Sequence, residues 1–445
     1  MVLNLKKRDK LFIGIIALVH VVFFMLACMY KRIYMGDSFE YIYEALNIKK
    51  YFFFYCGNPT MPIFPEYMTE RLPGYPLFLL AIYMFTINNW IVIVFQNVLS
   101  VFNIYYARKV FLQIGYHAKY DWLLLLFVIA YPAQFINANT IAPDILLQTF
   151  TLLYLGNFVL LLQKKQLKYS AYMSLALIAG IFVKPVLYPF VIIHILILTA
   201  TGIYNKVLLQ RTIAVAIMPI CAVLICNSIN YSRTGKFHFS SNQSVNAVYY
   251  YYAYFSQKEG IDSATKFLHN ERKNIAGHTE FKDRYDLANK RGVELLEQNF
   301  FPYMIFHLKN SARIFIEPGK GEMDLFTGKL TYGGLYNKQA QSGFYAMWKN
   351  KRWAGLNEYI HNNPSLLFVT LVFIFNCLRL IGMLLFFFDR KISWPIRIFI
   401  GILLLYFAIA AGPIANTRYF LPESLIAIGI AAMGYMSRLQ KRATK

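Results

Sequence analysis

The chain alternates long apolar runs with shorter polar segments. The first run extends from Leu11 to Tyr30, and later runs also have about the 20 residues that an α-helix needs to cross a hydrocarbon core. This pattern predicts an all-α polytopic membrane protein with about ten transmembrane helices. The expected spans cover residues 11–30, 90–111, 122–135, 145–162, 171–183, 186–204, 212–229, 364–388, 394–411 and 419–436.

Three segments depart from this pattern. Residues 38–55 alternate at helical spacing, which predicts an amphipathic helix in the first loop. Residues 73–87 are apolar but short, which favours an interfacial or half-buried helix over a span. Residues 230–363 are polar, mixed in charge and long enough for a small extramembrane domain. The expected organisation is an N-terminal transmembrane module (1–229, first outer loop 31–72), a mainly helical outer segment (230–363) and C-terminal transmembrane helices (364–445).

Composition and charge agree with a membrane location. Hydrophobic residues make up 58% of the 445 residues and charged residues 15%, whereas soluble domains carry about 25% charged residues. The basic clusters, including 6–10, 164–168 and 438–445, all fall on one side of the expected topology, which is typical of cytoplasmic loops. The net charge of +23 therefore suits anionic membrane lipids. No nucleic-acid-binding motif is present, so we expect no nucleic-acid partner.

The first apolar run follows the basic cluster 6–10 and shows no small-residue cleavage site. It therefore predicts a signal anchor rather than a cleaved signal peptide.

Charged residues also gather at the opposite, non-cytoplasmic ends of the expected spans. Because charges beside a membrane are costly, those present are expected to be paired or functional, and both signs at one leaflet favour a shared pocket. Single residues keep other interpretations: Asp144 suits a helix cap, Lys184 a snorkelling anchor, and Glu40 a solvated helix-face charge. The set is Asp37, Glu40, Glu66, Glu70, Arg71, Asp144, Lys184 and Arg418.

Five short motifs at these ends carry a family resemblance. They are Gly36-Asp37 with Tyr41, Arg71-Leu-Pro-Gly-Tyr-Pro-Leu-Phe78, Pro143-Asp144, Lys184-Pro185 and Arg418-Tyr-Phe-Leu-Pro422. In their order and common sidedness they resemble the GT-C superfamily of membrane glycosyltransferases. The nearest branch contains the protein O-mannosyltransferases and the transferases that add aminoarabinose to lipid A. The resemblance covers most of residues 1–230 and about 395–437, while 230–363 match nothing in it.

The resemblance implies an inverting glycosyltransferase of a bacterial inner membrane, with its site facing the periplasm. It would move a sugar from a polyprenyl-phosphate donor to a lipid, glycan or protein acceptor. Asp37 would be the general base. Arg71 would meet the leaving phosphate with its forked guanidinium, supported by Lys184 and Arg418. The expected substrate-binding residues are Asp144, Tyr75, Asn137, Asn139, Tyr419 and Glu66.

Two further points stay open at the level of sequence. The resemblance allows a divalent cation, Mg²⁺ or Mn²⁺, on Asp37 and Asp144, because hard cations prefer carboxylate oxygens. A transporter or flippase of a lipid-linked saccharide is the alternative function. It would place functional charges at mid-membrane depth and at both leaflets, and the chain shows no internal repeat of fixed period in its support.

Overall fold

The computed structural model describes residues 7–205, 209–329 and 365–443. Within these ranges the secondary structure is helical, with no strand. The helices are α1 (Lys7–Tyr30), α2 (Ser38–Tyr51), α3 (Gly74–Tyr83), α4 (Asn89–Gln113), α5 (Asp121–Ile129), α6 (Ala133–Ala138), α7 (Asp144–Lys164), α8 (Leu167–Val183), α9 (Phe190–Asn205), α10 (Leu209–Thr234), α11 (Asn242–Glu259), α12 (Ile261–Ala276), α13 (Phe281–Gln298), α14 (Phe300–Arg313), α15 (Lys320–Phe326), α18 (Ser365–Phe387), α19 (Trp394–Ala411) and α20 (Thr417–Ala443). Short 3-10 turns lie at Pro65–Met68, Ala118–Tyr120 and Pro185–Leu187.

Seven helices in the described ranges are long and apolar enough to cross a membrane. They are α1, α4, α7, α10, α18, α19 and α20. Helices α3, α8 and α9 are apolar but only 10–17 residues long. The prediction of a helical membrane protein is therefore confirmed, whereas the number of about ten spans stays a prediction.

The expected span over residues 122–135 is wrong as a single helix. Helix α5 ends at Ile129, and a second helix of six residues, α6, begins at Ala133. The break lies at Pro132, which has no amide hydrogen to donate and disfavours helical backbone at the residue before it. The consequence matters for the site, because α6 and the turn after it lead the chain directly into the start of α7.

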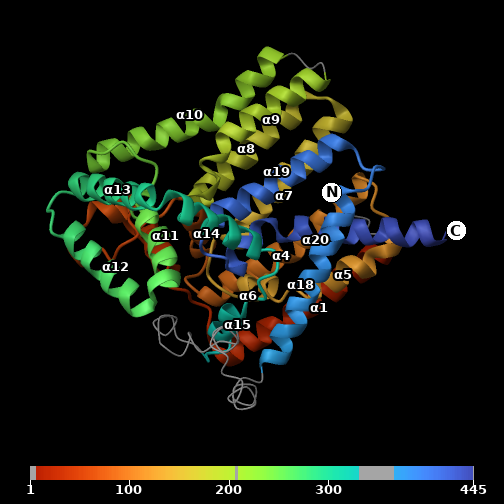
Figure 1. Ribbon diagram of the computed structural model, residues 1–445, viewed down its shortest axis with the longest axis horizontal. Helices are drawn as coiled ribbons and strands as arrows, with labels where there is room; N and C mark the ends of the chain where they lie inside the picture. Colours follow the sequence, from red (N-terminus) through yellow and green to blue (C-terminus); the bar gives the residue numbers. More distant parts are fainter. Residues whose placement is uncertain (1–6, 206–208, 330–364, 444–445) are drawn as a thin grey trace.

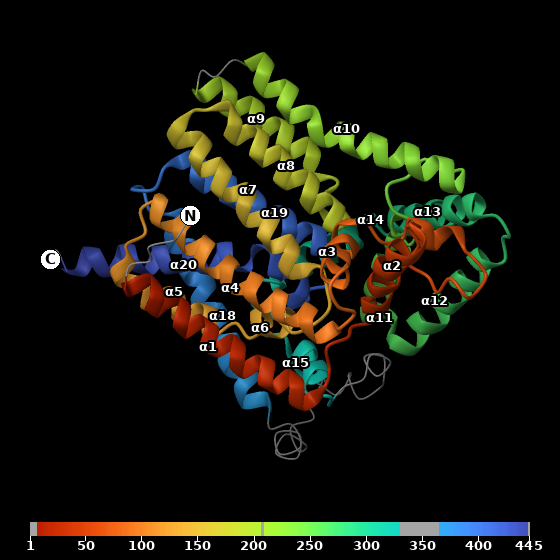
Figure 2. The same cartoon turned by 180° about the vertical axis from the view of Figure 1, so that it is seen from behind.

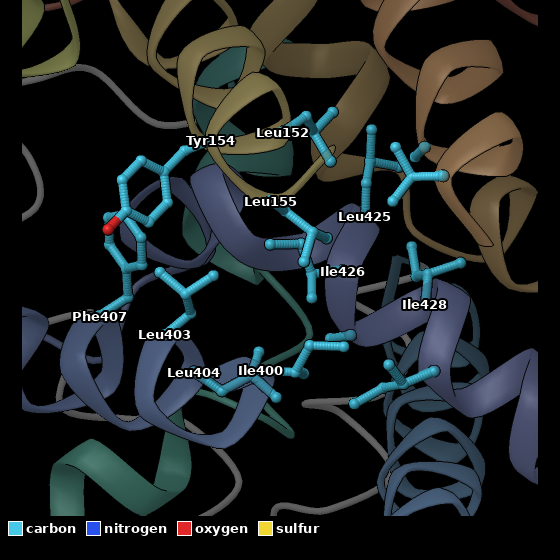
Figure 3. Packing of buried hydrophobic residues seen from close by; sticks show 14 of the residues in the cluster. Leu152, Tyr154, Leu155, Ile400, Leu403, Leu404, Phe407, Leu425, Ile426 and Ile428 are labelled. Carbon is cyan, nitrogen blue, oxygen red and sulfur yellow. The ribbon is translucent and has the colours of Figure 1, made fainter. Parts of the chain in front are cut away.

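Helix α20 is the centre of the bundle. Nearly all of its apolar window is buried inside the protein, more than in any other candidate span described. Figure 3 shows how its residues Leu425, Ile426 and Ile428 pack with side chains of α7 and α19. A Cβ at Gly434 would lie 2.0 Å from the carbonyl oxygen of Gly382 on α18, so only glycine allows the two helices this close approach. Because α20 is enclosed by other helices, the residues of its first turn, including Arg418, are held in a fixed position.

Helices α11, α12 and α13 form a lobe at one end of the molecule, which we call the lobe end (Figure 1). Both chain termini lie towards the opposite end, here called the terminal end, as Figure 2 also shows. Helices α2 and α3 lie on the side of the lobe, as labelled in Figure 2. The lobe corresponds to the first part of the expected outer segment, and residues 330–363 of that segment lie outside the described residues.

Candidate functional site

Four charged side chains meet at the lobe end. The guanidinium of Arg418 donates to both carboxylate oxygens of Asp37, at 2.9 and 3.4 Å, and through Nε to Oδ2 of Asp144 at 2.7 Å. Lys184 Nζ donates to the other oxygen of Asp144 at 2.7 Å. The four residues therefore form one chain of alternating charge, and the sequence-based expectation that they gather at one place agrees with this geometry.

Each member of this cluster stands at the end of a helix. Asp37 precedes the first residue of α2, Asp144 is the first residue of α7, and Arg418 is the second residue of α20. Lys184 follows the last residue of α8 and is succeeded by Pro185, which starts a 3-10 turn. Polar residues suit these positions because helix ends leave backbone groups without partners, and the bundle brings four such ends together.

The loop that carries Asp37 is tied to the turn between α6 and α7 by hydrogen bonds to the backbone of Ile141. Ser38 Oγ donates to the carbonyl of Ile141 at 2.7 Å and accepts from the amide of Met35 at 2.7 Å. The amide of Ile141 donates to the carbonyl of Ile33 at 2.8 Å. Ile141 lies just before Pro143 and Asp144, so the same turn positions both carboxylates of the cluster.

Glu322 of α15 is a member of the site that the sequence did not reveal. Its Oε1 accepts from the backbone amide of Arg418 at 3.1 Å, and the side chain is buried. Gly319, with φ of +76°, packs against Thr417 next to it. No sequence signal singles out Glu322, because it lies in the segment that matches no motif and is brought to α20 only by the fold.

The ion pair with Arg418 controls the charge of Asp37. Burial alone would raise the pKa of Asp37, but the positive charges of Arg418 and Arg71 outweigh it and lower the pKa to about 2. Because the folded-state pKa lies below the ordinary value, this pairing stabilises the fold above about pH 4 and is lost as the pH falls through about 2. Asp37 is therefore ionised, and weakly basic, at neutral pH.

Arg71 lies next to the cluster and does not bind Asp37 directly. It forms an ion pair with Glu40, one turn after Asp37 on α2, and its guanidinium lies 5.2 Å from the centre of the Tyr41 ring. Glu40 is therefore ion-paired on the face of α2, while about 30% of its side chain stays exposed. A Cβ at Gly74 would come within 2.7 Å of the backbone of Phe182, so the turn after Arg71 packs against the end of α8 that carries Lys184.

A cavity of about 250 Å³ opens beside Arg71. Arg71, Arg233 and Glu44 line its polar part. Arg233 donates to the backbone carbonyls of Met68 and Phe54, at 3.3 Å each, and forms no ion pair with a carboxylate in the described residues. Sequence reasoning missed Arg233, although it lies just beyond the expected span 212–229 and the rule that selected Lys184 also applies to it.

Apart from Thr69 and Asn230, the rest of this cavity is apolar, and α10 forms one of its walls. Ala222, Ile225, Cys226 and Ile229 line it, at the spacing of one helical face. Ile225 and Ile229 are exposed on a helix that is apolar enough to span a bilayer. The cavity thus joins a lipid-accessible apolar wall to two guanidinium groups, an arrangement suited to a lipid with an anionic headgroup.

Glu44 is the unusual group in this cavity. It is buried, and its Oε2 has no hydrogen-bond partner. Burial raises the pKa of Glu44 to about 8, against the smaller opposing effects of Arg233 and Arg71. At neutral pH the side chain is therefore a neutral acid that can donate a hydrogen bond into the cavity.

A second cavity, of about 260 Å³, lies beside the loop that carries Asp37. It is lined by Gly36, by Glu322 of α15 and by the stacked rings of Tyr34 and Phe39, whose centres lie 5.0 Å apart. It shares no lining residue with the first cavity. None of the four cluster residues lines either cavity. The second cavity reaches the cluster through Gly36, the neighbour of Asp37, and through Glu322, which binds the amide of Arg418.

Of the expected substrate-binding residues, Tyr419 and Asp144 belong to the cluster. Lys184 Nζ lies 4.8 Å from the centre of the Tyr419 ring. Tyr75 is fully buried, packs edge-on against Tyr41 and donates to Gln96 at 2.5 Å, so it supports the site from behind.

Three of the expected residues have other partners. Asn139 Nδ2 donates to the carbonyl of Phe135 at 2.9 Å, and Asn137 Nδ2 donates to the carbonyl of Ala133 at 2.8 Å. Both side chains are buried and their amide nitrogens donate within the protein, while Oδ1 of Asn137 is buried without a hydrogen-bond partner. Glu66 forms an ion pair with Arg284 of the lobe. The prediction that these three residues line the site therefore does not agree with their contacts.

The two proposed metal ligands converge, but on Arg418. Asp37 and Asp144 both bind its guanidinium, which fills the place between the carboxylates. The described residues contain no group of three or more His, Cys, Asp or Glu side chains that could hold a metal ion. A divalent cation on Asp37 and Asp144 would need Arg418 to move aside, and its presence stays a prediction.

Three comparisons bear on identity. No family model matches the chain, no curated protein matches it and no solved structure matches it. The site must therefore be interpreted from its own geometry.

Proposed function

We propose that the protein is an inverting glycosyltransferase that moves a sugar from a polyprenyl-phosphate donor to an acceptor on the non-cytoplasmic face of a bacterial inner membrane. The observation that carries the proposal is an ion-paired carboxylate, Asp37, near two cavities. Arg71, next to the cluster, lines the cavity that joins two arginines to a lipid-accessible wall, and Gly36, the neighbour of Asp37, lines the other. Sugar transfer from a lipid phosphate needs these parts: a base, cations for the leaving group and a groove for the lipid.

The donor fits the first cavity. Its phosphate would lie between Arg71 and Arg233, and its polyprenyl chain would follow Ile225 and Ile229 on α10. Glu44, neutral at pH 7, would donate a hydrogen bond to a phosphate oxygen rather than repel it. Forked, charge-assisted hydrogen bonds from arginine suit the phosphate that departs.

The reaction is a single displacement. The acceptor hydroxyl enters from the second cavity and attacks the anomeric carbon through an oxocarbenium-like state. The bond between that carbon and the phosphate oxygen breaks, and the electron pair leaves with the phosphate. Asp37 takes the hydroxyl proton. The anomeric centre is inverted because the hydroxyl attacks once, from the face opposite the leaving phosphate. Lipid, glycan and protein acceptors are all compatible with the opening.

Donor binding would also activate the base. Asp37 is weakly basic while Arg418 donates two hydrogen bonds to it. A phosphate close to these cations competes for the guanidinium, and a loosened pair raises the proton affinity of Asp37. The base is then strongest only when the leaving group is in place.

The test uses purified protein in nanodiscs with a panel of radiolabelled polyprenyl-phosphate sugars and measures release of the lipid phosphate. Asp37→Asn should lower the rate by about 10²-fold or more, as removal of a general base does. Asp283→Asn, on the exposed surface of α13, is the matched control. Wild-type rates in Asp37→Asn would exclude Asp37 as the base.

A transporter or flippase of a lipid-linked saccharide is a second candidate, because two charges lie within spans. Glu423 on α20 is buried with both carboxylate oxygens unpartnered, and Arg379 on α18 is buried. Arg379, however, donates to the carbonyl of Phe315 at 2.8 Å and lies 4.7 Å from the Phe420 ring, which suits a structural role. Translocation of a fluorescent lipid-linked sugar without cleavage, lost in Glu423→Gln, would favour this candidate.

A further inference from the structure

Helix α14 presents a broad apolar face to its surroundings. Phe300, Phe301, Met304, Ile305 and Leu308 are between 38% and 69% exposed. Their spacing places them along one side of the helix. Five large apolar side chains in one patch are more than the surface of a water-soluble lobe ordinarily presents, so the face calls for an apolar partner.

The other side of α14 is already occupied. Tyr303 and Phe306 pack against Tyr254 of α11, with ring centres 6.1 and 5.5 Å apart, and Ser311 is buried. These contacts fix the rotation of the helix on the lobe. Because the opposite side of α14 packs on α11, the exposed apolar face points away from α11, and the lobe does not cover it.

Contacts with α19 define where α14 lies along the bundle. His307 Nε2 lies 2.8 Å from the carbonyl oxygen of Ile409, and the His307 ring fills the space beside Gly412. This is the lobe end of a helix apolar enough to span a membrane, and its Leu405 and Ile409 side chains are exposed. The apolar face of α14 thus continues the lipid-facing surface of α19 at the level where that span ends.

Charge along α14 agrees with this position. Lys309 and Arg313 are exposed beside the apolar residues, and Arg313 also pairs with Glu317 at 2.8 Å. Basic residues on the polar side of an amphipathic helix meet lipid phosphates at the headgroup level, while the apolar side enters the upper acyl region.

We propose that α14 is a membrane-surface helix that anchors the α11–α13 lobe to the leaflet at the lobe end. The occupant of its apolar face is lipid, and the inference does not depend on the proposed reaction. The anchor also reaches the site, because the chain after α14 enters the bundle. Asn376 donates to the carbonyl of Glu317 at 2.8 Å, and the same segment continues to Glu322, which binds Arg418.

The experiment places a fluorescent reporter on this face. Phe301→Trp is made in the full chain and reconstituted into phosphatidylcholine nanodiscs, with or without bromine atoms near the top of the acyl chains. The added Trp emission should be lost in the brominated discs. His269→Trp, on the exposed polar side of α12, is the control and should lose no more than the native background. Equal quenching in the two variants would overturn the proposal.

A second measurement separates lipid from another copy of this chain as the occupant. The double variant Phe301→Ser with Ile305→Ser should keep the molecular mass that the wild-type protein shows in nanodiscs, while hydrogen exchange over α14 becomes faster. A wild-type dimer that the double variant converts to a monomer would show instead that the face is a subunit interface, which overturns the proposal.

Discussion

Asp37 owes its behaviour to its neighbours. A free aspartate in a loop would be an unremarkable base, but here the guanidinium of Arg418 holds it ionised with a pKa of about 2. The cluster is electrically balanced, because two negatively charged carboxylates and two positively charged side chains form ion pairs in series. Under the proposed function, a phosphate bound by Arg71 and Arg233 would add negative charge near this cluster and weaken the hold of Arg418 on Asp37.

Glu44 gives a pH dependence of donor binding. As the pH rises through about 8 the side chain ionises, and a negative charge in a buried cavity repels phosphate. The affinity for a polyprenyl phosphate should therefore fall about tenfold between pH 7 and pH 9, because about one tenth of the Glu44 side chains stay protonated one pH unit above the pKa. Glu44→Gln should bind with little change over this range, as measured by equilibrium binding of labelled lipid. Glu297→Gln, exposed on α13, should behave as the wild type; a wild-type affinity independent of pH would contradict this role for Glu44.

The residues that converge could be predicted from sequence because each stands at the end of a long apolar run. Asp144, Lys184 and Arg418 satisfy this rule, and they meet Asp37. Arg233 satisfies it as well and was passed over. Glu322 could not be predicted, because its contact with Arg418 spans 96 residues of chain and depends on tertiary packing alone.

The asparagine side chains show what sequence reasoning predicted wrongly. Asn97 donates to Asn139 at 3.0 Å, inside the protein, and this pairing hides Asn139 from any ligand. Polar residues at a span end were expected to face the exterior, but buried amides need partners and the nearest ones lie in the bundle. Burial of this kind depends on the neighbouring helix and is invisible in one stretch of sequence.

At the scale of elements, Gly74 sets the approach of α3 to α8. A side chain there would overlap the backbone of Phe182 and Val183, which cannot yield as a flexible side chain can. Gly74→Ala should therefore destabilise the protein by about 1–3 kcal/mol, as overpacking does, and lower donor affinity because Arg71 shifts. Gly14→Ala on α1, where a Cβ meets nothing within 4 Å, is the control for thermal unfolding in detergent. Equal melting temperatures of the two variants would show that α3 adjusts freely.

The terminal end is held by a separate charged cluster. Arg108 on α4 is buried and donates to Asp9 at 2.8 Å and to Asp121 at 3.0 and 2.9 Å. Arg108→Met would leave two carboxylates without their main partner and should cost about 3–5 kcal/mol of stability. Lys109→Met, which removes a more exposed partner of Asp9, should cost about 1 kcal/mol or less.

The measurement for this pair is thermal unfolding together with donor binding by the protein that remains folded. Both variants should bind the donor normally, since this cluster lies at the opposite end from Asp37. A loss of binding in Arg108→Met without a loss of stability would instead mean that the two ends are coupled.

The positions of the helices were predictable from the apolar runs, but whether one run forms a single unbroken helix was not. The helices at 38–51 and 74–83 fall within the expected ranges, and the expected span at 122–135 is broken at Pro132. Hydropathy averages over such a break, because the residues on either side stay apolar. The break also bears on the charged cluster, since α6 and the turn after it lead into α7, whose first residue, Asp144, binds Arg418.

At the scale of the whole molecule, the two ends have different tasks. The terminal end carries a closed ion network in which Arg108 is fully enclosed by its partners. The lobe end carries a charged cluster with two cavities near it. We propose that α14 attaches the lobe to the membrane surface at this end.

The most direct test of the central claim is a structure of the Asp37→Asn protein in nanodiscs with a bound polyprenyl-phosphate sugar. The account predicts the phosphate within hydrogen-bond distance of Arg71 and Arg233, the lipid chain along α10, and the anomeric carbon directed towards position 37. A lipid phosphate bound elsewhere, with the cavity beside Arg71 and Arg233 filled by protein side chains, would contradict it.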